Sequence, residues 1–226
     1  MAKSVDTLLG GNDDTLQARA AIVLERLEAA YPNARCSLDF ANPFQLLIAT
    51  ILSAQCTDER VNLVTPALFA RYPTPVEFMI APIEEIEQAI HSTGFYRNKA
   101  RSIQGASRML VEECGGVVPS TMDELLRLPG VARKTANVVL GNAFAIVEGV
   151  VVDTHVGRIS RRLGFTIHED PVKVEADLMA LLPRASWLDY VHRIILHGRA
   201  VCTAKRPRCA ECILAPVCPS AGVSTG

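Results

Sequence analysis

Apolar residues recur at every third or fourth position through most of the chain, in segments separated by turn-forming residues. This spacing is typical of amphipathic helices. N-capping residues and prolines mark several helix starts, Thr121 and Glu124 match a capping box, and Gly115-Gly116 follows the longest helix of the central part. We predict helices over residues 16–30, 43–53 (capped by Asn42), 58–71 (capped by Thr57), a short stretch from 75, 82–91, 96–114, 122–128, 135–144, 154–163, 171–182 and 186–200.

One run, Ala145 to Val152, is β-like, but it is short and contains Gly149. We interpret it as an apolar connection between helices. The sequence shows no internal repeat and no low-complexity tract. The predicted fold class is therefore all-α.

The central reversal of the chain reads Leu128-Pro129-Gly130-Val131-Ala132-Arg133-Lys134. Pro129 and Gly130 interrupt the helical pattern, which resumes almost at once, so the segment predicts a helix, a tight hairpin and a second helix. So short a reversal favours a residue that tolerates positive φ, which Gly130 supplies. The second helix begins with unpaired backbone N–H groups, so the hairpin is a candidate phosphate site.

Lys134 falls in the first turn of that second helix. The positive end of the helix dipole and the neighbouring Arg133 both disfavour its ammonium form. A lysine in this position is a candidate amine nucleophile. Most lysines are solvated surface residues, and position alone favours that alternative or simple phosphate binding.

Composition and charge limit the other classes of protein. The chain has 226 residues, of which 49% are apolar, so it can bury a core in one domain or two. We expect neither a membrane span nor an export signal, and residues 1–14 are predicted to form a loose tail. A compact chain without a targeting extension favours a bacterial cytoplasm.

The net charge of −1 conceals an uneven distribution. Fifteen of the 23 basic residues fall in four windows without Asp or Glu: 97–108, 127–134, 158–162 and 193–208. This favours a polyanionic partner, although solvated helix faces are the ordinary alternative.

Four of the seven cysteines crowd the C-terminal end with the spacing C-x6-C-x2-C-x5-C: Cys202, Cys209, Cys212 and Cys218. In a chain without an export signal this predicts a metal site and not disulfides. Zinc sites usually show two C-x2-C pairs, and an iron–sulfur cluster fits at least as well. The loop between the first two cysteines carries three cations, Lys205, Arg206 and Arg208.

Two further residues attract attention. Asp153 follows the apolar run and precedes a predicted helix, so an N-cap is its ordinary role, which does not exclude a catalytic one. Gln55 lies where one helix gives way to the next, and taken alone it is an ordinary polar residue.

Several motifs together resemble the endonuclease III family of helix-hairpin-helix DNA glycosylases: L-P-G-V-A-R-K-T-A, V-D-T-H-V, L-S-A-Q-C-T-D, T-G-F-Y-R-N-K-A, I-L-H-G-R and the cysteine spacing. They occur in the family's order between about residues 16 and 219. The resemblance implies a six-helix domain over 36–147 and a second domain of 15–35 plus 148–226 that holds a 4Fe–4S cluster, with the active cleft between them. It implies a monomer in the cytoplasm, associated with the nucleoid, that acts on double-stranded DNA containing oxidised pyrimidines or abasic sites, removing the base and nicking the strand.

The resemblance also assigns roles. Lys134 and Asp153 match the catalytic pair, and Gln55 and Phe95 match residues that fill the space left by a flipped base. Gly130, Val131, Ala132 and Arg133 match the DNA-binding hairpin, and the four cysteines match the cluster ligands.

Two departures from the family pattern stand out. The hairpin commonly reads G-V-G, so Ala132 would be strained if its φ were positive. Phe95 stands where leucine is more usual.

Two alternatives remain at this stage. A monofunctional adenine glycosylase disagrees with Lys134 and with the absence of its extra domain. A non-catalytic DNA-binding or electron-transfer protein leaves the pairing of Lys134 with Asp153 unexplained.

Overall fold

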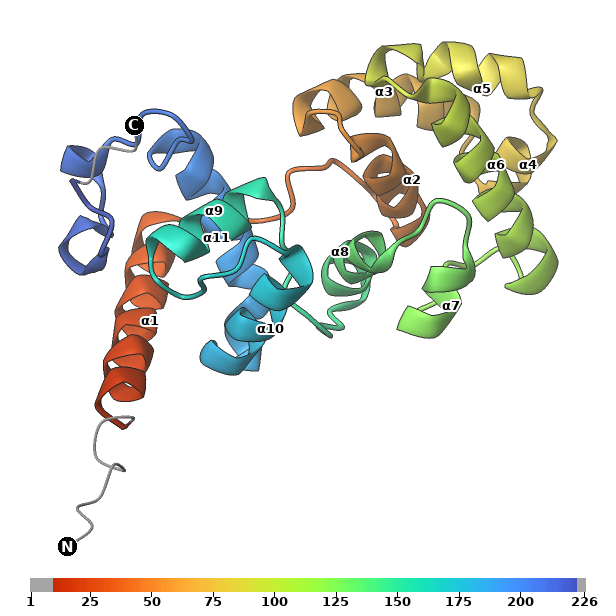
Figure 1. The fold of residues 1–226 in the computed structure, drawn as a ribbon. Coiled ribbons are helices and arrows are strands. Elements are labelled where there is room, and N and C mark those ends of the chain that lie inside the picture. Colours follow the sequence, from red (N-terminus) through yellow and green to blue (C-terminus); the bar gives the residue numbers. More distant parts are fainter. Residues whose placement is uncertain (1–9, 223–226) are drawn as a thin grey trace, which may run out of the picture. The chain divides into compact units, whose positions relative to one another are not determined.

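A computed structural model describes residues 10–222 of the chain, with side chains from Thr15 onward (Figure 1). The all-α prediction is confirmed, since no residue between 10 and 222 is in a strand. The elements in order are α1 (Gly10–Ala30), α2 (Pro43–Ser53), α3 (Asp58–Arg71), α4 (Pro75–Ile80), α5 (Ile83–Ala89), η1 (His91–Thr93), α6 (Tyr96–Glu113), α7 (Met122–Arg127), α8 (Arg133–Phe144), α9 (Thr154–Arg162), α10 (Pro171–Leu181), η2 (Arg184–Ser186), α11 (Trp187–Ala200), η3 (Cys209–Glu211) and η4 (Ala215–Val217).

The predicted caps begin the helices where expected. The Asn42 side chain accepts a hydrogen bond of 2.9 Å from the Gln45 N–H, and the Thr57 side chain accepts one of 3.3 Å from the Arg60 N–H. Thr121 accepts from the Glu124 N–H at 3.4 Å. Each bond satisfies a donor that the first turn of a helix leaves unpaired.

Two predicted boundaries were wrong. Helix α1 begins at Gly10, within the segment 1–14 predicted as a tail; residues 1–9 of that segment lie outside the described residues. The helix predicted over 82–91 is two elements, because α5 ends at Ala89 and a separate 3-10 turn, η1, runs from His91 to Thr93. Gly94 (φ +70°) and Phe95 (φ +48°) then separate η1 from α6.

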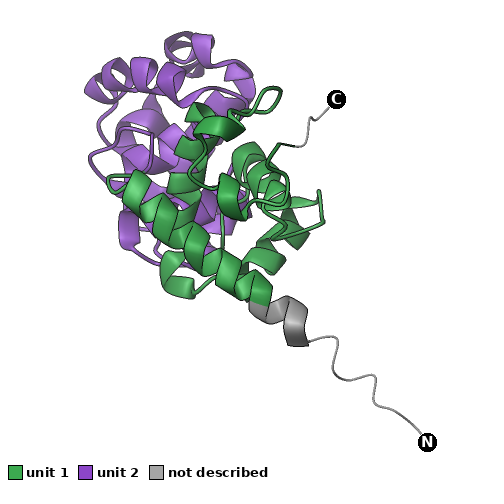
Figure 2. Ribbon diagram, turned by 90° about the vertical axis from the view of Figure 1, so that its left-hand side faces the viewer, with its two compact units in different colours: residues 1–35, 149–226 green, residues 36–148 purple. Residues whose placement is uncertain are grey.

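The chain forms two compact units, coloured separately in Figure 2. Unit 2 is the continuous segment 36–148, and unit 1 combines the chain before residue 36 with the chain from 149 onward. In unit 2, helix α6 packs against α4 and α5, and α2 packs against α8. Buried side chains such as Leu47, Phe78 and Ile103 fill its core.

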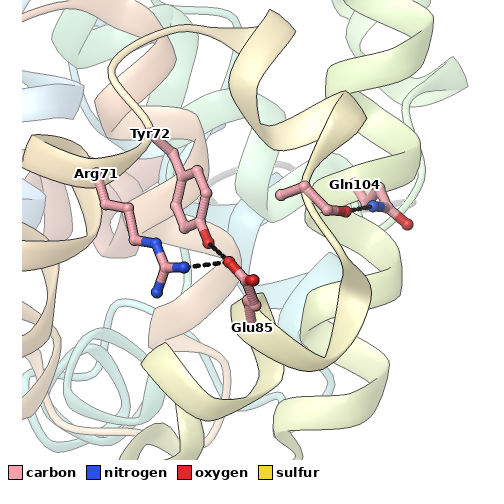
Figure 3. A network of polar contacts seen from close by, with 5 residues as sticks. Arg71, Tyr72, Glu85 and Gln104 are labelled. Atoms are coloured by element: carbon pink, nitrogen blue, oxygen red, sulfur yellow. Dashed lines mark hydrogen bonds and ion pairs between the residues drawn. The ribbon is translucent and has the colours of Figure 1, made fainter.

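Two separate sets of polar contacts connect elements of unit 2 (Figure 3). The Tyr72 hydroxyl donates to Glu85 at 3.2 Å, and Arg71 pairs with the same carboxylate, so the end of α3 is tied to α5. Gln104 on α6 donates to the Ala81 carbonyl at 2.8 Å. Burial raises the pKa of the Tyr72 phenol.

Unit 1 brings together helices from both ends of the chain. Helix α1 packs against α11, which in turn packs against α9. Tyr190 on α11 is fully buried, and its hydroxyl forms a hydrogen bond of 2.8 Å with Ser160 on α9. No helix of the described chain is both long enough and apolar enough to span a membrane.

Candidate active site and cysteine-rich loop

The hairpin between α7 and α8 depends on a glycine. Gly130 has φ +78°, and a Cβ added to it would lie 2.6 Å from the Cβ of Ser102 on α6. The Val131 N–H donates to the Leu128 carbonyl at 3.1 Å, and the Val131 side chain is buried. The prediction of positive φ at Gly130 is therefore confirmed, and close approach of α6 is a second reason for glycine.

Ala132 is not strained. It is the residue before α8 and has an extended backbone, with φ −98° and ψ 171°. Because φ is negative, the methyl group of Ala132 causes no left-handed backbone strain. Unlike α2, α3 and α9, helix α8 has no side-chain cap on its first N–H groups, and its first turn has no acidic residue.

Lys134 is the second residue of α8, as the sequence predicts, and its side chain is exposed. No Asp or Glu within residues 15–222 forms an ion pair with it. The uncapped helix start, Gly130 and Lys134 together make one exposed, cationic end of unit 2.

Asp153 is the N-cap of α9 in unit 1. Its Oδ1 atom accepts a hydrogen bond of 2.7 Å from the Val156 N–H. The side chain is half-buried. The N-cap role predicted for Asp153 is confirmed. The cap uses Oδ1, so the carboxylate has a second oxygen that can contact a substrate.

Gln55 and Phe95 share an unusual backbone conformation. Gln55 has φ +52° and Phe95 has φ +48°, the left-handed region that residues other than glycine seldom adopt. Both side chains are exposed, and that of Phe95 is 62% exposed. Such strain persists only where surrounding structure imposes it, and it is common at functional sites. Neither residue type predicts this conformation, because glutamine and phenylalanine rarely adopt positive φ.

The four C-terminal cysteines line one cavity of about 90 Å³. None of the seven cysteines forms a disulfide, and all seven lie within the described residues. No set of three or more His, Cys, Asp or Glu side chains in the described residues converges closely enough to hold a single metal ion. A water needs roughly 10–15 Å³, so this cavity has room for a group larger than a single water molecule. Thiolates are ligands of both zinc and iron–sulfur clusters, and the lining of the cavity fits either.

Two contacts to the cysteine sulfurs were not anticipated. Arg162 on α9 donates to the Cys202 Sγ atom at 3.2 Å and to the Thr203 and Ala204 carbonyls at 2.8 Å. His197 on α11 lies with Nε2 3.4 Å from the Cys212 Sγ atom.

The other ring nitrogen of His197, Nδ1, is 3.0 Å from the Tyr31 hydroxyl. Burial lowers the pKa of His197 and raises that of Tyr31. Both are therefore neutral, and the chain is satisfied when the phenol donates to Nδ1 and the Nε2–H donates to the sulfur. Because neither ring is charged, the hydrogen-bonded series Tyr31–His197–Cys212 places no unpaired cation at the buried His197.

Burial raises the pKa of the Cys212 and Cys218 thiols, although backbone N–H groups of Leu214 and Ser220 oppose it. The Cys202 thiol close to both adds to the rise. Such thiols lose their protons when a metal binds, since thiolates are the ligands.

The basic windows divide into surface and interior residues. Lys205, Arg206 and Arg208 are exposed on the loop between Cys202 and Cys209. Arg158 and Arg162 point inward and donate to carbonyls of the same loop. Lys99 is only 5% exposed, so the interpretation of its window as a DNA-binding surface is wrong for this residue.

Comparison with known proteins decides the family. The pattern that defines the HhH-GPD superfamily of base excision DNA repair proteins matches residues 48–184. Endonuclease III from Synechocystis sp. is 60% identical over 206 residues, which cover 91% of this chain and 94% of that protein. The chain belongs to the endonuclease III family. Endonuclease III from Bacillus subtilis is 49% identical over 196 residues, 86% of this chain and 89% of that protein.

Solved structures agree with this assignment. A non-covalent endonuclease III–DNA complex superposes with a TM-score of 0.86 at 46% identity, covering 91% of this chain and 96% of that chain. A thermostable thymine-DNA glycosylase, at 20% identity and a TM-score of 0.80, shares the fold. As a member of the endonuclease III family, the chain is a base excision repair enzyme, a DNA glycosylase and AP lyase.

Proposed function

We propose that this enzyme removes oxidised pyrimidines from double-stranded DNA and then cleaves the strand through a Schiff base on Lys134. The observation that carries the proposal is the exposed Lys134 in the first turn of the uncapped helix α8, directly after the Gly130 hairpin. An exposed lysine without an ion-pair partner among residues 15–222 is available to a reacting sugar.

The hairpin supplies a phosphate site. N–H groups around Gly130 and in the first turn of α8 point toward the helix end, where they favour an anion. The Val131 N–H is already bonded to Leu128, so Val131 serves the site by packing the hairpin, with Ala132 and Arg133 leading into the helix. Lys205, Arg206 and Arg208 add cations from the cysteine-rich loop.

Gln55 and Phe95 are proposed to occupy the stack when the damaged base is flipped out. Both side chains are exposed and held by an unusual backbone, as insertion into a duplex requires. Phe95 brings a large aromatic surface on which a base can stack.

The proposed reaction begins with attack of Lys134 on the deoxyribose. The neutral amine of Lys134 attacks C1′ of the deoxyribose, the glycosidic bond breaks, and its electron pair leaves with the base, which takes up a proton. Ring opening gives the Schiff base, a proton leaves C2′, and the C3′–O bond breaks by β-elimination. The Asp153 carboxylate stabilises positive charge that develops on the sugar and then accepts the proton released by Lys134.

We further propose that Cys202, Cys209, Cys212 and Cys218 hold one 4Fe–4S cluster. Their common cavity and the sulfur contacts of Arg162 and His197 support it. When bound, such a group fixes the fold of the basic loop. In this proposal unit 2 is the helix-hairpin-helix domain, unit 1 the cluster domain, and the enzyme a cytoplasmic monomer associated with the nucleoid.

Borohydride trapping tests the central claim. The protein is incubated with a duplex that contains one thymine glycol, and reduction converts any Schiff base into a stable adduct. We expect an adduct with the wild type and with Lys173→Ala, which changes an exposed lysine on α10 that has no part in the proposed site, and none with Lys134→Ala. An adduct of undiminished yield with Lys134→Ala would refute the nucleophile. Base release without any adduct would identify a monofunctional glycosylase, and binding without either would identify a non-catalytic protein.

A further inference from the structure

One buried ammonium joins the two segments that carry Gln55 and Phe95. Lys99 lies on α6, and its Nζ atom donates to the Leu52 carbonyl at 2.8 Å and to the Thr93 carbonyl at 2.8 Å. Leu52 belongs to the last turn of α2, three residues before Gln55. Thr93 is the last residue of η1, two residues before Phe95.

The ammonium group of Lys99 is buried and has two defined hydrogen-bond acceptors. The side chain is only 5% exposed, and both acceptors are carbonyls at the ends of helical segments, where a cation is favoured. Burial lowers the pKa of Lys99, and the nearby Cys56 thiol opposes that shift. A lysine that served only solubility would point to solvent, so a buried one with two defined acceptors has a positional task.

The same face of α6 also supports the hairpin. Three residues beyond Lys99, the Ser102 side chain lies against Gly130, closely enough to exclude a Cβ there. After another three residues, a Cβ added to Gly105 would lie 3.2 Å from the Pro129 ring. Residues spaced by three lie on one side of a helix. Helix α6 therefore contacts the hairpin with one end of this face and both left-handed turns with the other.

We propose that Lys99 is a positioning residue that holds the turns of Gln55 and Phe95 in a fixed position relative to each other and to the hairpin. Both side chains can then enter the DNA base stack together. The inference rests on the proposed function, since it assumes that these two residues insert. Left-handed backbone at a non-glycine residue is unfavourable, and the anchored carbonyls three residues before Gln55 and two residues before Phe95 help to hold it. Without Lys99 the two turns relax separately.

The first test is Lys99→Met, which keeps the length of the side chain and removes the donors. Excision of thymine glycol and nicking of a preformed abasic site are measured in single turnover, beside thermal unfolding. We expect base excision to slow about ten-fold or more, as for loss of charged hydrogen bonds, and abasic nicking to slow much less because no base must be expelled. Lys99→Gln, whose amide can still donate, should recover part of the rate and covers the case in which the Met variant does not fold.

Leu110→Ala is the matched control. Leu110 is fully buried on the same helix, far along the sequence from both turns, so this change lowers stability without touching either carbonyl. Well below its unfolding temperature it should excise and nick at nearly wild-type rates. If Lys99→Met shows the same pattern as Leu110→Ala, Lys99 is merely structural and the proposal is overturned.

A double-mutant cycle identifies the route of the effect. If Lys99 acts through the inserting residues, adding Lys99→Met to Gln55→Ala/Phe95→Ala should slow excision by less than about two-fold further. Full multiplication of the two losses overturns the positioning role and leaves the proposed function intact. A wild-type excision rate for Gln55→Ala/Phe95→Ala would overturn the insertion roles, and the positioning proposal with them.

Discussion

At the scale of single residues, Asp153 has two tasks that chemistry can separate. Its Oδ1 atom caps α9, and its charge serves the reaction in the proposed mechanism. Asparagine caps helices about as well as aspartate, whereas alanine does not. Asp153→Asn should therefore unfold in urea like the wild type but lose most base excision, while Asp153→Ala should lose activity and about 1 kcal/mol of stability. Normal turnover by Asp153→Asn would mean that Asp153 caps α9 and has no role in the reaction.

The hairpin offers a second test on neighbouring residues. Gly130→Ala places a methyl group at φ +78° and against Ser102, so we expect a loss of about 2 kcal/mol or more in urea unfolding, with weaker DNA binding. Ala132→Gly is the control. Because Ala132 is extended and is the N-cap of α8, a position where glycine is preferred to alanine, this change should stabilise the protein by up to about 1 kcal/mol. A loss of stability as large as that of Gly130→Ala would mean that the hairpin responds to any change and not to the conformation of Gly130.

The sequence predicts those residue positions that depend only on neighbouring residues in the chain. Asn42, Thr57 and Lys134 stand where expected, since a cap or a first-turn position depends on the next three or four residues. The burial of Lys99 could not be predicted, because one of its acceptors, Leu52, is 47 residues away. A basic window shows charge but not which side of the helix carries it.

At the scale of elements, the cysteine-rich loop depends on α9. Arg162 donates to one cysteine sulfur and two carbonyls of this loop. Arg162→Ala should therefore reduce the iron retained per chain after gel filtration, and weaken DNA binding with a shallower salt dependence as Lys205 and Arg206 lose their order. Arg161→Ala, which removes the same charge from the same helix, is the control. Full iron content in Arg162→Ala would mean that the loop holds the cluster unaided.

Element boundaries show where sequence patterns suffice. Helix α6 ends one residue before its predicted end, because Gly115 follows Cys114 and stops the helical pattern. The sequence does not predict the division between α5 and η1, since Ile86, Ile90 and Thr93 are buried at a helix-like spacing through both elements. Periodicity reports which residues are buried, and a 3-10 turn buries the same face as the helix before it.

At the scale of the whole molecule, the order of the chain sets what each unit needs in order to fold. Unit 2 is one continuous segment whose core draws only on residues 36–146. Unit 1 is interrupted by it and depends on α1, where Val23 and Leu27 are fully buried. Arg26 on α1 also donates to the Ile213 carbonyl at 2.8 Å, beside the cysteine-rich loop. Unit 2 therefore needs only one continuous segment in order to fold, whereas unit 1 needs segments from both ends of the chain.

A fragment of residues 36–148 should consequently fold alone, with helical circular dichroism and a cooperative thermal transition, because its buried core is complete. It should bind DNA weakly and excise nothing, since Asp153 and the cysteine-rich loop are missing. A fragment of residues 149–226 should remain unfolded even with iron and sulfide, because α11 has lost α1. Addition of a peptide of residues 10–35 should restore helicity to that second fragment. If 149–226 folds unaided while 36–148 does not, the cores are not divided at residues 35 and 149 as the structure indicates.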